Sequence, residues 1–118
     1  MRQSMRKEVS QVFVATNRLT IKAGFGQELE QQFGRHSGVE QQPGFLGFEL
    51  WKLDKEADHE EYLVVTHWES KEAHHSWTRS EAFRQAHAGP RPEFLIGGEF
   101  SSYEVRLSSL PGRTKART

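Results

Sequence analysis

One short segment constrains the fold of this chain more than any other. Residues 12–22, VFVATNRLTIK, alternate with a period of two and are rich in β-branched side chains, which is typical of a strand. One face of this strand carries every second residue, namely Phe13, Ala15, Asn17, Leu19 and Ile21. Asn17 is the only polar residue in that row. The first predicted strand therefore has an apolar face that other elements must cover. One carboxamide, that of Asn17, lies in the middle of this face.

Turn and cap signals divide the rest of the chain into five further regions. Pro43-Gly44 is a strong turn signal, and Ser70 and Ser80 are each followed by an acidic residue within two positions, as at the start of a helix. The predicted regions are, in order, a helix from 27 to about 40 built on Leu29, Phe33 and His36, strands at 45–53 and 61–68 joined by an acidic loop, two short helices that begin after Ser70 and Ser80, and a strand at 100–107.

The order of these elements is β-α-β-β-α-β, which predicts a ferredoxin-like α+β fold. Four antiparallel strands would carry the helices on one face of the sheet. The other face would still expose Val12, Val14 and Thr16 of the first strand. A second copy of the same sheet would cover them economically, so we expect an isologous homodimer in the form of a dimeric α+β barrel.

Length and charge indicate one folded unit at residues 12–107, between a polar, mobile N-terminal extension at 1–11 and a basic, flexible tail at 108–118. The formal net charge is zero, but without the charged ends ten basic and fifteen acidic residues remain. The net negative charge of the chain between its two ends argues against binding to nucleic acid. No apolar run has the length of a membrane span or of a signal peptide's core, so we expect a soluble cytoplasmic protein that does not bind membranes.

Three residues are candidates for chemistry, and each also has a structural interpretation. Asn17 is either a hydrogen-bonded core amide or a donor that points into a pocket under the helices. His87 shares a helix face with Phe83 at i, i+4 and should point toward the sheet, as a core residue or as a ligand of haem iron. Trp77 is most simply a core residue.

Other chemistries find little support. The chain has no cysteine, which excludes disulfides and thiolate ligands. His67, His74 and His75 lie near one another in the sequence and could be read as a non-haem metal site. However, the side chains of adjacent helical residues such as His74 and His75 diverge by about 100°, which disfavours a shared metal ion. Gly24-Phe25-Gly26 is only the beginning of a dinucleotide-binding motif. An enzyme with this sequence must obtain redox chemistry from a molecule that it binds.

Three segments together resemble a known family. They are ATNRLTI around Asn17, PGFLGFEL from Pro43, and VVTHWESKEAHHSWTRSEAFRQAHAG from Val64. This combination resembles the antibiotic-biosynthesis monooxygenase superfamily, and most closely its haem-degrading branch, the IsdG type, which includes IsdG, IsdI and MhuD. The resemblance covers about residues 12 to 107. The spacing of Asn17, Trp77 and His87 is the part that is specific to the haem-degrading branch.

The resemblance implies a role for each of these residues. His87 would be the axial ligand of haem iron, Asn17 would reach toward the oxygen-binding side, and Trp77 would press on the porphyrin and hold it ruffled. Haem would be both substrate and cofactor. Its porphyrin ring would be opened by O₂ with electrons from a reductase or a small reductant, and iron would be released. On electrostatic grounds, candidates for contacts with the haem propionates are Arg35, His36 and Arg91.

Two alternatives stay open at this point. The first is a cofactor-independent quinol monooxygenase of the same superfamily, which would not require His87. The second is a haem-binding carrier or sensor without turnover.

Overall fold

The computed structural model describes residues 12–35, 38–55 and 57–110. The two terminal extensions therefore lie wholly or mostly outside the described residues, and so does His36. The elements are β1 (Phe13–Lys22), α2 (Gly26–Phe33), a short 3₁₀ helix (Val39–Gln41), β2 (Phe45–Lys52), β3 (His59–Trp68), α3 (Lys71–Thr78), α4 (Glu81–Ala86) and β4 (Leu95–Glu104).

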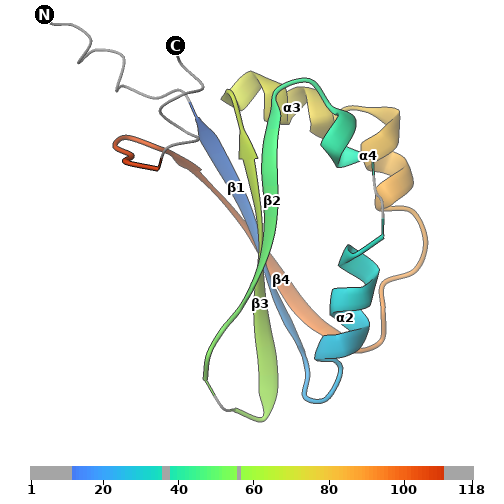
Figure 1. The fold of residues 1–118 in the computed structure, drawn as a ribbon. Coiled ribbons are helices and arrows are strands. Elements are labelled where there is room, and N and C mark those ends of the chain that lie inside the picture. The colour runs from blue at the N-terminus through green and yellow to red at the C-terminus, as the bar shows by residue number, and fades with distance from the viewer. Residues whose placement is uncertain (1–11, 36–37, 56, 111–118) are drawn as a thin grey trace, which may run out of the picture.

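The four strands form one antiparallel sheet in the order β2-β3-β1-β4. All three α-helices lie on the same side of this sheet (Figure 1). This arrangement confirms the ferredoxin-like α+β fold that the order of the elements predicted. Because β1 lies in the middle of the sheet and pairs with both β3 and β4, its apolar row runs along the centre of the helix-covered face.

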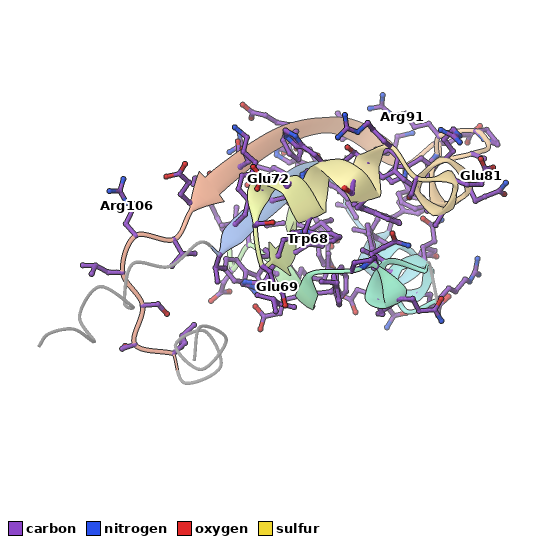
Figure 2. All side chains as sticks on the ribbon, turned by 90° about the horizontal axis from the view of Figure 1, so that it is seen from above. Trp68, Glu69, Glu72, Glu81, Arg91 and Arg106 are labelled. Carbon is purple, nitrogen blue, oxygen red and sulfur yellow. The ribbon has the colours of Figure 1, made fainter. Side chains whose placement is uncertain are left out.

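The core consists of two clusters, and β1 contributes to both. The first cluster lies under α3 and α4 and contains Phe13, Ala15, Val39, Trp68 and Trp77. The second cluster lies under α2 and contains Leu19, Ile21, Leu29 and Tyr62. Trp68 is fully buried beneath α3 (Figure 2). The helices therefore cover the sheet as two separate groups, one over each part of the apolar row.

Both predicted cap residues start a helix. The Ser70 hydroxyl accepts a hydrogen bond from the amide of Ala73 at 3.1 Å, and the Ser80 hydroxyl accepts one from the amide of Phe83 at 3.0 Å. Each side chain satisfies a backbone donor that has no partner within the first turn of its helix. The second helical region is therefore two short helices, α3 and α4, as the sequence predicted.

Two predicted boundaries were wrong. The helix expected from 27 to about 40 ends at Phe33, with Gly34 as its C-cap, and Gly38, with a φ of 89°, could not have belonged to a right-handed helix. The last strand runs from Leu95 to Glu104 rather than over 100–107. Its first half contains two glycines, which are uncommon in strands, so the sequence did not indicate a strand there. A bulge opposite Thr20 and Ile21 allows this half to pair with β1.

The sheet face away from the helices also differs from expectation. Val12 and Thr16 are buried within the single chain, and Val14 is half-buried, so the first strand does not expose its apolar residues there. Large exposed side chains on this face come instead from the outer strands, from Trp51 of β2 and Tyr103 of β4. In the described part of the chain, no helix is long and apolar enough to cross a membrane.

Candidate functional site

Asn17 lies where the two groups of helices leave the sheet uncovered. Its neighbours in the same row, Ala15 and Leu19, are buried with exposed fractions of 5% and 7%, whereas Asn17 itself is exposed. The side chain is therefore not a hydrogen-bonded core amide. We call the uncovered part of the helix-side face around this residue the Asn17 opening. A carboxamide at its centre is free to meet a ligand.

The neighbouring strands place apolar groups at the same level. Asn17 pairs with Val64 of β3 and with Phe100 of β4, and paired residues of antiparallel strands project from the same face. At Gly98, an added Cβ would lie 3.6 Å from Asn17 Oδ1. The absence of a side chain there keeps the surface beside Asn17 open. The sequence did not single out Gly98, because β4 was predicted to begin at residue 100, or Phe100, because its pairing with Asn17 is a long-range contact.

Trp77 and His87 belong to one series of ring contacts at the end of the sheet that α3 and α4 cover. The Trp77 indole is buried, stacks on Trp68 at a centroid distance of 6.4 Å, and meets the edge of Phe83 at 5.3 Å. The Phe83 ring in turn stacks on the His87 imidazole at 4.0 Å. The structure therefore connects Trp77 to His87 through Phe83, and Phe83 and His87 are in contact at i, i+4 although His87 lies just beyond the last residue of α4.

His87 is an exposed residue that caps the C-terminus of α4, and it is not part of the core. Its Nδ1 lies 2.9 Å from the Phe83 carbonyl oxygen. A carbonyl oxygen can only accept, so in the neutral ring Nδ1 carries the proton and the lone pair lies on Nε2. Histidines that bind metals are commonly oriented by such a hydrogen bond to the other ring nitrogen. Nε2 of His87 is accordingly prepared to act as a ligand.

The candidate cations are exposed. Arg35 follows directly after the C-cap of α2. Arg91 lies in the segment between α4 and β4, at the outside of the molecule (Figure 2). His36 lies outside the described residues, so its position relative to the Asn17 opening is not described.

The three histidines of the non-haem metal hypothesis are separated by the sheet. His67 pairs with Val14 on the face away from the helices, where it lies 3.9 Å from Glu49. His74 and His75 both belong to α3, where His74 is buried and His75 is exposed. These positions cannot converge on one ion. Among the described residues, no group of three or more potential ligands gathers around a common point.

Fold and site together define a class of protein. The model of the family "Antibiotic biosynthesis monooxygenase" matches residues 12–89, and the chain belongs to this family. Within it, the chain is 38% identical to the heme-degrading monooxygenase of Shouchella clausii over 100 residues, which cover 83% of this chain and 94% of that relative. It is also similar to MhuD of Mycobacterium tuberculosis, a heme-degrader solved with two hemes in its active site. That match has 41% identity and a TM-score of 0.66, and it covers 81% of this chain and 97% of MhuD.

The same fold also carries other oxygenases. SnoaB of Streptomyces nogalater, a cofactor-independent oxygenase, matches with a TM-score of 0.67 over 86% of this chain and 99% of SnoaB, at 21% identity. At that identity the likeness concerns the fold alone. The choice of chemistry within the family therefore depends on the residues at the site.

Proposed function

We propose that this protein is a haem-degrading monooxygenase, which binds haem as its substrate and opens the porphyrin ring with O₂ and external electrons, releasing iron. The observation that carries the proposal is His87. Its Nδ1–H is held by the Phe83 carbonyl and its Nε2 is left as a donor to iron. Relatives that share 33–38% identity with this chain over nearly their whole length are heme-degrading monooxygenases, and this supports the same conclusion.

The residues of the site fit the chemistry of haem. Haem is flat and apolar with two anionic edges, so it requires an apolar wall, a ligand and cations. Val64 and Phe100 supply apolar surface at the level of Asn17. Arg35 and Arg91 are exposed cations that could pair with the propionates, and His36 remains a third candidate on the same electrostatic grounds.

Each of the three predicted site residues then has a separate task. His87 would hold the substrate through Nε2. Asn17 would direct its amide donor from the sheet toward the side of the substrate where O₂ reacts. Trp77 is buried and stacked on Trp68, so it would act as a rigid surface that presses on the porphyrin and does not move away. When bound, haem supplies the iron centre at which O₂ is activated, and electrons come from a reductase or a small reductant.

A haem titration followed by reduction and exposure to air tests the proposal. Ferric haem should bind with a shifted Soret band. After anaerobic reduction and admission of air, this band should disappear while free iron appears. If the protein binds no haem, the cofactor-independent quinol monooxygenase becomes the better proposal. If haem binds and its Soret band survives repeated cycles of reductant and O₂, the protein is a carrier or a sensor.

We further propose that the protein works as a homodimer through the sheet face away from the helices. Trp51 and Tyr103 are 51% and 56% exposed on this face. Tyr103 also lines a cavity of about 210 Å³ on this face, together with Thr16, Arg18, Leu63, Glu99 and Ser101. Arg18 and Glu99 form an ion pair there, so a second sheet could cover this face without burying either of these charges alone.

A further inference from the structure

Phe100 is a large apolar side chain in an unusual position. It lies on the helix-covered face of the sheet, level with Asn17, and yet 59% of it is exposed. The other large side chains on this face of the central strands, Phe13 and Trp68 among them, are buried in the core. On the same face of β4, the neighbouring Gly98 has no side chain that could cover Asn17. The Phe100 ring therefore borders the Asn17 opening with one side uncovered.

The other side of this ring is supported by His74 of α3. The two rings are stacked, with a centroid distance of 5.9 Å and an interplanar angle of 16°. His74 is itself buried, with an exposed fraction of 8%, and it contacts Phe13 at 5.4 Å and Trp68 at 5.6 Å. Phe100 thus rests on a residue that is wedged into the first core cluster.

His74 serves here as a flat ring and not as a charge. Burial lowers its pKa, with a smaller contribution from neighbouring His75. Its Nδ1 is buried and has no hydrogen-bond partner among the described residues. A buried nitrogen without a partner is costly, so a purely structural position would favour phenylalanine or leucine. The same ring meets Trp68, on which Trp77 stacks, so it links Phe100 to Trp77.

We propose that Phe100 is a further substrate-contacting residue of this site, an aromatic wall beside Asn17 against which the porphyrin lies, and that His74 is the positioning residue that holds its ring. The proposal rests on the proposed function, because the porphyrin is the ligand. Aromatic rings prefer offset-stacked or edge-to-face contacts with other flat π-systems. The exposed side of Phe100 offers such a surface, and its support by His74 means that little rotamer freedom is lost on binding.

Titration with ferric protoporphyrin IX in the absence of reductant tests the proposal, because binding is then measured without turnover. Phe100→Ala should weaken binding about tenfold, and Phe100→Leu about threefold, as expected for losing a stacked ring. The wavelength of the bound Soret band should not change, because the proposed ligand His87 is retained. Leu107→Ala is the matched control. It removes an apolar side chain that is 85% exposed beyond the end of β4, and it should bind like the unaltered protein.

The role of His74 has its own test in the same titration. His74→Ala should weaken binding severalfold, whereas His74→Phe, which keeps a flat ring, should restore it. In the Phe100→Ala background, His74→Ala should have little further effect, because the ring that it positions is absent. Circular dichroism establishes that each variant is folded, and Phe100→Leu carries the test if Phe100→Ala is not.

The possible results separate the two proposals. If the unaltered protein binds haem and Phe100→Ala binds within twofold of it, Phe100 is not a wall of the site and this inference is overturned alone. If His74→Phe fails to restore binding, His74 does not act as a ring on Phe100. If the unaltered protein binds no haem, the proposed function fails first, and the inference fails with it.

Discussion

His87 owes its suitability as a ligand to its place at the end of a short helix. As the C-cap of α4 it is exposed, and its Nδ1 reaches back to the Phe83 carbonyl within the same turn. The stack on Phe83 holds the ring plane. Two local contacts therefore define both the tautomer and the orientation of this side chain before any ligand arrives.

The first prediction concerns this ligand. His87→Ala should abolish haem degradation and change the ferric haem spectrum, because it removes the proposed axial nitrogen. Absorbance titration and single-turnover assays measure both effects. His75→Ala, which alters an exposed histidine of α3, is the control and should leave both unchanged. An unaltered spectrum in His87→Ala would mean that another group is the ligand. His36 is then the next to test, whereas His67 lies on the opposite face of the sheet.

The second prediction separates binding from catalysis at Asn17. Asn17→Ala should bind haem nearly as tightly as the unaltered protein, yet degrade it about 10²–10³ times more slowly, the typical effect of one donor that faces developing negative charge. The reason is that the amide would act only late in the reaction, so its loss affects the rate more than ground-state affinity. Equal rates of degradation in the variant and the unaltered protein would reduce Asn17 to a surface residue.

At the scale of elements, α2 is attached to the sheet by one buried phenol. The Tyr62 hydroxyl donates a hydrogen bond to the Glu30 carboxylate at 2.6 Å, and 2% of Tyr62 is exposed. Burial, and then the bond to Glu30, raise the pKa of Tyr62. The same residue belongs to the second core cluster, which ends next to the Asn17 opening. The stability of this contact therefore bears on the shape of the site.

The third prediction is a pH dependence that follows from this contact. Because the pKa is raised in the folded state, the stabilisation is complete below the ordinary tyrosine pKa of about 10 and is lost as the pH rises above it. The free energy of unfolding in urea should therefore be unaffected by this group up to about pH 10 and should fall as the pH rises further. Tyr62→Phe should be less stable by about 1 kcal/mol at neutral pH and should show a smaller alkaline loss. Tyr103→Phe, at the only other tyrosine, is the control. Parallel pH curves for Tyr62→Phe and the unaltered protein would contradict the prediction.

At the scale of the whole molecule, the sheet is covered by helices on one side only (Figure 1). The fourth prediction is that Val14→Glu, on the face away from Asn17, destabilises the homodimer or the fold, because it places an unpaired charge in the proposed interface. The penalty should reach several kcal/mol. Gln32→Glu adds the same charge to an exposed position of α2 and should have no such effect. Sedimentation of both variants measures the outcome, and a stable monomer for the unaltered protein would end the dimer proposal.

The sequence alone was sufficient for the features that depend on local physics. Strand β1, the two serine caps and the order of the elements follow from periodicity and from short-range hydrogen bonds, which a chain carries in its own residues. Asn17 could be identified as exceptional for the same reason, because it is polar in an apolar row. The likeness to haem-degrading enzymes also depended on residues that lie close together in the sequence, such as Trp77 and His87.

Only the tertiary structure decided what depends on partners far along the chain. Whether Asn17 is buried or exposed depends on where α2 stops and where α3 begins to cover the sheet. The position of Phe100 beside it depends on the register of β4 with β1, which joins residues 83 positions apart and which the two glycines of β4 concealed. In the sequence His74 belonged to a group of histidines for which a shared metal was disfavoured, and no local pattern indicated its role, whereas packing makes it a buried ring that supports Phe100. Long-range contacts of this kind are not encoded in any local pattern, since each becomes defined only when the sheet has assembled.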